Sequence, residues 1–239
     1  MRIQILKLAA ACAMMGSMAI AAPAFAQDEE EAEGPITVTG GVTVVSDYRF
    51  RGVSLSDKDF AVQPTLTVSH ESGFYVGVWG SNLAENAGDD VEVDLYAGFA
   101  GGDAVTYDLG ATYYLYPGVS SFNYVELTGK LGTTVGPVKL GGQLSYVPSQ
   151  DNTGNNDNIY LGTNASIGIP DSPITLTASV GYEDGAFTTG SGKLDWTLGA
   201  TASFSGFTAG VSYVDSDRRS VFVGGDAKAA VVFSLGYAF

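Results

Sequence analysis

The sequence predicts an all-β fold: a single transmembrane antiparallel up-and-down β-barrel of about 12 strands, with short periplasmic turns and longer external loops. Three observations predict it. Polarity alternates with a period of two residues, short and long connections alternate along the chain, and charged residues keep to one face of the predicted strands. After residue 26, no stretch approaches the roughly 18 apolar residues of a membrane-spanning helix, so a chain that crosses a membrane must cross it as strands.

The first 26 residues have the features of a secretory signal peptide. Arg2 and Lys7 give a basic start, residues 8–22 are almost wholly apolar, and residues 24–26 read Ala-Phe-Ala, a small-residue cleavage signal. We therefore expect the protein to be exported and this segment to be removed.

The mature chain divides into a short tail and one domain. Residues 27–35 contain an acidic run and predict a solvated periplasmic tail. Residues 36–239 form the predicted outer-membrane barrel. The only cysteine, Cys12, lies in the predicted signal peptide, so the mature chain has no thiol for a disulfide or a thiolate site.

The mature chain is strongly acidic. The whole sequence has 26 acidic and 11 basic residues, and removal of Arg2 and Lys7 leaves nine basic residues and a formal net charge of −17. A nucleic-acid partner is excluded because phosphate binding needs the opposite sign.

From Ile36 onward, the chain consists of twelve short segments of alternating polarity. In the first, Ile36, Val38 and Val42 share one face and Thr37 and Thr39 the other. The segments are residues 36–50, 60–70, 74–82, 91–99, 105–116, 122–131, 138–147, 159–168, 174–182, 194–204, 207–214 and 229–239. Most have close to the 9 to 11 residues that a tilted strand needs to cross a bilayer. Their even number is typical of single-chain bacterial barrels.

The connections between these segments alternate in length. The short ones carry turn residues and span 71–73, 100–104, 132–137, 169–173 and 205–206, and the longer ones include 51–58, 83–90, 148–158, 183–193 and 215–228. This pattern predicts periplasmic turns at one end, external loops at the other, and both termini on the periplasmic side.

Charged residues within the segments all have the parity of the polar face. A basic residue on the lipid face near the bilayer midplane costs about 2–4 kcal/mol, so one-sided placement indicates a lipid-facing wall. A soluble β-sandwich also alternates, but its polar face carries many more charges. The candidate pore-lining residues are Asp47, Arg49, Glu92, Asp94, Asp108, Tyr114, Glu126, Lys130, Lys139 and Asp195, with Arg51 at the rim.

Aromatic residues of the apolar parity gather at the segment ends and predict two interfacial girdles. Those beside the short turns are Phe74, Phe99, Phe204, Phe207 and Phe239, and those beside the long loops are Tyr48, Phe50, Phe60, Tyr146, Tyr182, Trp196 and Tyr213. Pro64 lies within the second segment and predicts a bulge or a shorter strand there.

Several motifs in the first half of the mature chain resemble a known family. They are SDYRFRGVS at 46–54, SGFYVGVWGSN at 72–82, VDLYAG at 93–98, YDLG at 107–110 and YYLYPG at 113–118. With these motifs the chain resembles the TorF family of proteobacterial porins. The resemblance implies an outer-membrane location and a porin-like role, and it transfers no catalytic or ligand residues.

The end of the chain, LGYAF, resembles the terminal strand of outer-membrane proteins generally. The resemblance implies that Tyr237 and Phe239 form an assembly signal for the barrel assembly machinery. Outer-membrane lipid, this machinery, periplasmic chaperones, and small solutes or ions are thus the expected partners.

The polar interior predicts a channel for passive diffusion of small solutes or ions. The alternative is a structural or surface-interaction barrel whose lumen is closed by ion pairs. A barrel hydrolase is less favoured, because the only histidine, His70, has the parity of the lipid face and lies beside a short turn. The acidic loops at 85–90 and 151–157 could bridge divalent cations, but neither has the spacing of a calcium loop. We expect no enzymatic activity, cofactor or metal.

Overall fold

The computed structural model describes residues 34–84, 90–188, 190–217 and 227–239. The predicted signal peptide and residues 27–33 of the predicted tail lie outside the described residues. No helix in the described part of the chain is long and apolar enough to cross a membrane.

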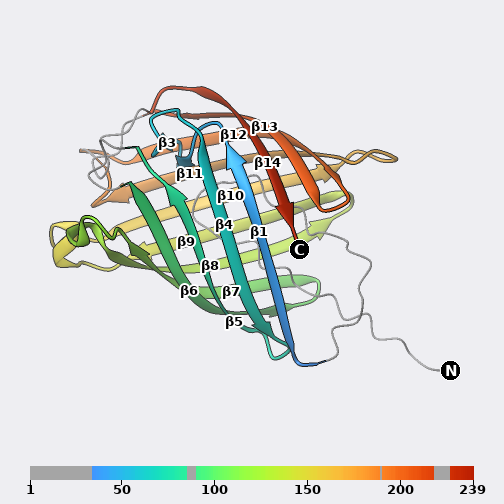
Figure 1. Ribbon diagram of the computed structural model, residues 1–239, viewed down its shortest axis with the longest axis horizontal. Helices are drawn as coiled ribbons and strands as arrows, with labels where there is room; N and C mark the ends of the chain where they lie inside the picture. The colour runs from blue at the N-terminus through green and yellow to red at the C-terminus, as the bar shows by residue number, and fades with distance from the viewer. Residues whose placement is uncertain (1–33, 85–89, 189, 218–226) are drawn as a thin grey trace.

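Twelve antiparallel strands form a closed barrel, which confirms the predicted fold class (Figure 1). The strands are β1 (Ile36–Val45), β4 (Ala61–His70), β5 (Phe74–Asn82), β6 (Val91–Gly102), β7 (Val105–Leu115), β8 (Tyr124–Val135), β9 (Val138–Val147), β10 (Asn158–Gly168), β11 (Ile174–Gly185), β12 (Lys193–Phe204), β13 (Phe207–Ser216) and β14 (Ala230–Ala238). Neighbours in this series pair with one another, and β1 also pairs with β14, which closes the ring. Each of the twelve strands thus has a neighbouring strand on both sides, as a lipid environment requires.

Short and long connections lie at opposite ends of the barrel, as predicted (Figure 1). At one end, β8 and β9 are joined by two residues, Gly136 and Pro137, with Gly136 at a φ of 59°. At the other end, the connections after β7 and β9 include the 3-10 turns η2 (Ser120–Phe122) and η3 (Asp151–Thr153). The first residue of β1 and the last residue of β14 both lie toward the short-turn end of the barrel.

The strand register aligns apolar side chains in belts on the outer wall. Leu66 pairs with Val78, Val78 with Leu95, Leu95 with Tyr113, and Tyr113 with Val125, across five successive strands. The first four of these side chains are exposed on the outer face. An apolar outer face and a polar inner face together invert the arrangement of a soluble protein.

Aromatic side chains mark both ends of the outer wall. Phe204, 82% exposed, and Phe74, 64% exposed, lie beside short turns, and Tyr146, Tyr182 and Tyr213 lie exposed near the long connections. Their places agree with the predicted girdles.

Glycines on the inner wall make room for the tyrosine rings of neighbouring strands. A Cβ on Gly98 would collide with the ring of Tyr75, and a Cβ on Gly181 would collide with Tyr160. The rings therefore lie against the wall instead of projecting freely into the lumen.

The predicted first strand is wrong beyond Val45. Ser46 still hydrogen-bonds β14, with its N–H donating to the Phe233 carbonyl at 2.9 Å, and the chain then turns into the barrel. Tyr48 and Phe50, predicted to face lipid, are therefore not on the outer wall, and Tyr48 is only 3% exposed.

The strand around Pro64 is continuous, although its pairing is one-sided. It pairs with β1 along its length, but its ladder with β5 begins only at Thr65. Before Thr65, the Asn82 side chain takes the place of the backbone pairing between β4 and β5. It accepts from the Val62 N–H at 2.7 Å and donates to the Phe60 carbonyl at 3.0 Å. The proline is tolerated because backbone pairing on that side has already ended.

We expect Leu109→Lys to lower the free energy of unfolding in lipid by about 2–4 kcal/mol, because Leu109 lies mid-strand on β7 and is exposed on the outer wall. The matched control is Thr112→Lys on the same strand, where the side chain lines the lumen and the change costs far less. Denaturant unfolding in lipid vesicles measures both, and equal losses would contradict a lipid-facing outer wall.

Candidate channel lumen and its plug

Residues 46–60, here called the plug, connect β1 to β4; residues 47–56 fold into the lumen and are almost wholly buried, and residues 57–60 are exposed. Within the plug, β2 (Arg49–Phe50) and β3 (Val53–Ser54) pair as a short hairpin. Arg51, Val53 and Ser54 are each no more than 2% exposed. This hairpin is the central feature of the barrel interior.

A two-residue turn forms the tip of the plug. Arg51 has a φ of 47° and Gly52 a φ of 83°, the positive values that a type I′ turn requires at both positions. A Cβ on Gly52 would lie 2.8 Å from Cβ of Ser216 and 2.9 Å from Cβ of Asp195. The tip therefore approaches the wall so closely that only glycine fits.

Polar contacts within the hairpin hold its shape. Asp47 accepts from the Ser54 hydroxyl at 2.6 Å and from Nε of Arg49 at 2.6 Å. The Leu55 N–H donates to the Tyr48 carbonyl at 2.8 Å, which extends the pairing toward the base of the hairpin. Arg49 is neutralised inside the plug by Asp47, 2.6 Å away.

Arg51 links the plug to the far wall of the barrel. Its Nη2 lies 2.6 Å from Oε2 of Glu126 on β8, and its Nη1 lies 2.7 Å from Oε1 of Glu183 on β11. Lys193 on β12 lies 3.0 Å from Oε2 of Glu183 and also donates to the Arg51 carbonyl. The strands that hold Arg51 are four and five places around the ring from β1, so the plug crosses the lumen.

The guanidinium of Arg51 is also in contact with aromatic rings. Its central carbon lies 4.3 Å from the ring centroid of Tyr160 on β10 and 4.7 Å from that of Phe50. Burial lowers the pKa of Arg51, but Glu126 and Glu183 outweigh it and raise the pKa well above its ordinary value. The buried side chain therefore stays charged and is held by two carboxylates and two aromatic rings.

A second set of contacts joins the plug to the wall at Glu92 on β6. The Tyr48 hydroxyl donates to Oε1 of Glu92 at 3.0 Å, and the Tyr116 hydroxyl donates to Oε2 at 3.2 Å. Burial, followed by the charge of Glu92, raises the pKa of both phenols. Both hydroxyls therefore stay protonated and donate to the carboxylate.

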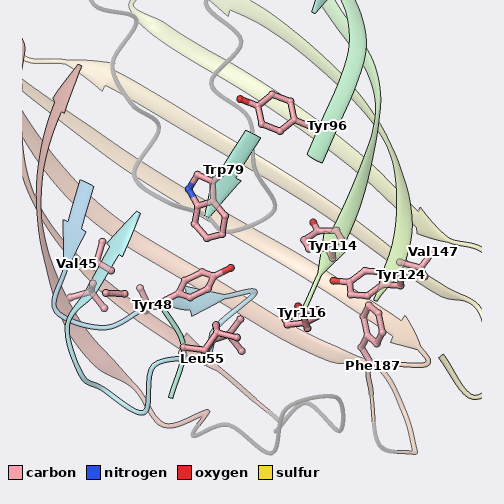
Figure 2. Close-up of a cluster of buried hydrophobic side chains, with 14 of the residues drawn as sticks. Val45, Tyr48, Leu55, Trp79, Tyr96, Tyr114, Tyr116, Tyr124, Val147 and Phe187 are labelled. Carbon is pink, nitrogen blue, oxygen red and sulfur yellow. The ribbon is translucent and has the colours of Figure 1, made fainter. Parts of the chain in front are cut away.

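Aromatic side chains of the barrel strands lie around the plug residues Tyr48 and Leu55 (Figure 2). Tyr48 of the plug packs against Trp79, with ring centroids 5.5 Å apart. On the other side, Tyr114 and Tyr124 stack at 4.4 Å, and Phe187 meets Tyr124 edge-on at 5.1 Å. The plug is thus surrounded by lumen aromatics as well as ion pairs.

Two small cavities lie beside the partners of Arg51, one next to Glu183 and the other next to Glu126. One, of about 20 Å³, lies among residues that include Leu55, Tyr116 and Phe187. The other, also of about 20 Å³, is lined by residues that include Tyr96, Asp108, Lys130 and Gln143. Each has room for about one water molecule.

Six of the candidate lumen residues are buried on the inner wall at the places the alternation predicts. These are Glu92, Asp94, Asp108, Tyr114, Glu126 and Asp195. Lys130 is half-buried inside, and Lys139 is exposed near the short-turn end of β9.

Three candidates lie elsewhere than predicted. Asp47 and Arg49 are in the plug and not on the wall, because the chain leaves the wall after Ser46. Arg51 is not at the rim, since its guanidinium is buried against the far wall by Glu126 and Glu183.

Sequence reasoning missed Glu183 and Lys193, which it assigned to an external loop. Strands β11 and β12 extend far enough that these residues pair with each other across the two strands, with both side chains inside. The alternation carried the signal: Tyr182 and Leu194 face outward, so the residues beside them, Glu183 after Tyr182 and Lys193 before Leu194, face inward.

The structure gives His70 a local role in the turn after β4. Its ring is exposed, and Nδ1 lies 2.7 Å from the Ser72 hydroxyl oxygen and accepts from the Ser72 N–H at 3.1 Å. Its strand pairing with Ile36, the first residue of β1, places it at the short-turn end.

The loop at 151–157 makes its own polar contacts. The Gln150 N–H donates to the Thr153 hydroxyl oxygen at 3.1 Å, and that hydroxyl lies 2.6 Å from the Asn156 carbonyl. Residues 85–89 of the other acidic loop lie outside the described residues. Within the described ranges, no group of three or more His, Cys, Asp or Glu side chains is placed to hold a metal ion.

Comparison with solved structures gives similar barrels. The structure superposes on the NanC porin with a TM-score of 0.57 and 12% sequence identity, covering 85% of this chain and 99% of that one. It superposes on the KdgM porin with a TM-score of 0.58 and 8% identity, covering 84% and 98%. At these identities the similarity establishes the fold.

Comparison by sequence gives a family. No curated protein matches the chain. Residues 29–239 match the family described as "Bacterial protein of unknown function (Gcw_chp)". The match spans the whole barrel, and the chain belongs to this Gcw_chp family.

Proposed function

We propose that the protein is an outer-membrane channel for passive diffusion of small solutes or ions, with a narrow path that the plug constricts. One observation carries the proposal. The barrel encloses charged and hydrogen-bonded side chains such as Glu92, Asp94 and Asp108. A purely structural barrel could be filled with apolar side chains, which avoid the free-energy cost of desolvating charges. The TorF resemblance and the likeness to porin structures support the same function.

The outer wall and the chain end support an outer-membrane location. An apolar outer face flanked by aromatic girdles suits a bilayer. The end of the chain completes the barrel, with the Phe239 N–H donating to the Gly40 carbonyl at 2.9 Å and Tyr237 packing on Phe207 at 4.8 Å. We propose that Tyr237 and Phe239 are also read by the barrel assembly machinery during biogenesis.

The second candidate function is a structural or surface-interaction barrel with a closed lumen. The bridge from Arg51 to Glu126 and Glu183 favours it, because removal of one partner from a buried ion pair costs about 3–5 kcal/mol. The two candidates differ in whether the plug opens in a membrane.

Unitary conductance in planar bilayers separates the two functions. We expect a small conductance from the wild-type protein and a larger one from Arg51→Ala, because that change removes the link from the plug to the far wall. Arg49→Ala, which leaves that link in place, changes conductance less, and Glu71→Ala in the exposed turn after β4 serves as the control. Membranes that stay silent with every variant contradict the channel and favour the closed barrel.

Ion selectivity gives an independent check. The inward-facing wall of the described strands has six acidic and three basic side chains, a net charge of −3; they are Glu92, Asp94, Asp108, Glu126, Glu183 and Asp195, with Lys130, Lys139 and Lys193. We expect reversal potentials in a salt gradient to show preference for cations. A preference for anions would contradict this reading of the lumen.

Cysteine labelling tests whether the tip of the plug lies inside the barrel. In a Cys12→Ser background, Val53→Cys is expected to react slowly with a polar maleimide, because Val53 is 1% exposed. Adding Gly52→Val should speed labelling, since a side chain there collides with Ser216 and Asp195. The control is Gly136→Val, which also has positive φ but meets open space. Fast labelling of Val53→Cys alone would contradict the plugged lumen.

A further inference from the structure

We infer that Glu126 and Glu183, together with the ring of Tyr160, form a binding site for the guanidinium or primary ammonium group of a permeating solute, and that Arg51 occupies this site in the plugged barrel. The inference rests on the proposed channel function, because it names the class of solute that the lumen accepts. All three wall residues belong to barrel strands, and Arg51 belongs to the plug.

The geometry of the site is that of a bound cation. Two carboxylates contact two different nitrogens of one guanidinium, at 2.6 and 2.7 Å, and the face of Tyr160 lies 4.3 Å from its carbon. Charged hydrogen bonds to carboxylates and an aromatic face are the interactions that recognise soluble guanidinium and ammonium compounds. A small solute with such a group could make the same contacts.

An unpartnered carboxylate oxygen lies beside the site. Tyr160 donates to Oδ1 of Asp195 at 3.3 Å, whereas Oδ2 of Asp195 is buried and has no hydrogen-bond partner in the described structure. Asp195 is 1% exposed. The wall therefore has an acceptor that Arg51 does not use, and a solute cation that sits differently from Arg51 could fill it.

Movement of the plug would leave the wall with uncompensated charge. Lys193 still neutralises Glu183 at 3.0 Å, but Glu126 loses its ion-pair partner, Arg51, and keeps the Tyr114 hydroxyl at 3.4 Å. A buried carboxylate without a counter-charge is costly. A solute cation that takes the place of Arg51 removes that cost, whereas an anionic solute adds to it.

Binding and opening are therefore linked. A solute that binds the wall only when Arg51 has left shifts the equilibrium toward the open plug. At ten times its Kd, such a solute raises the ratio of open to closed plug about tenfold. Cations of this class would thus promote their own passage.

Labelling of Val53→Cys in the Cys12→Ser protein, reconstituted in vesicles, tests the site without relying on conductance. The probe is ethylguanidinium chloride at millimolar concentration, and the comparison is tetramethylammonium chloride, which has the same charge and no N–H donors. We expect ethylguanidinium to speed labelling by up to about tenfold and tetramethylammonium to have little effect. Equal acceleration by both salts, or by neither, would overturn the inference.

Wall variants place the effect at the proposed site. Glu126→Gln should abolish the response to ethylguanidinium, and Glu183→Gln provides the same test if the first variant does not fold. Glu71→Gln, in the exposed turn after β4, should leave the response unchanged. A response that survives both wall substitutions contradicts the site.

Bilayer recordings keep the two proposals distinct. Accelerated labelling in a protein that never conducts would support the cation site and contradict the channel. Conductance without a specific ethylguanidinium response in labelling would support the channel and overturn the site.

Discussion

The bridge from Arg51 to Glu126 and Glu183 is the interaction on which the interior depends. A lipid-facing wall forces the polar side chains of this acidic chain inward, where their charges must be compensated. The wall alone does not compensate them, since its inward acidic residues outnumber the basic ones. Arg51 of the plug supplies a positive charge to Glu126 and Glu183 at the far side of the lumen, so the position of the plug is set by electrostatics as well as by packing.

The barrel and the plug depend on different features of the sequence. The barrel needs glycines under its lumen tyrosines and apolar belts outside, and these are local properties of each strand. The plug needs partners that are distant in sequence: Arg51 is 75 residues from Glu126 and 132 from Glu183. Because the Arg51 ion pairs and one glycine turn position the tip of the plug, a local change at Arg51 or Gly52 can alter the lumen while the barrel persists.

The same difference between local and long-range features explains what could and could not be predicted from the sequence. Strand number, wall orientation and loop alternation follow from a period of two and from turn residues, which are local signals. The plug was missed because its hairpin continues the same alternation through Tyr48 and Phe50. The length of the first predicted segment argues against a single strand, because its 15 residues exceed what a tilted strand needs to cross a bilayer. The partners of Arg51 depend on barrel closure, which no local pattern encodes.

A double-mutant cycle between Arg51 and Glu126 tests the central claim most directly. The free energy of unfolding in lipid is measured for the wild type, Arg51→Met, Glu126→Gln and the double variant. If the bridge holds the plug in the lumen, the two substitutions are non-additive, with a coupling energy of about 0.5–3 kcal/mol. Additive effects, within about 0.5 kcal/mol, would show that the two side chains do not interact in the membrane and would contradict this account.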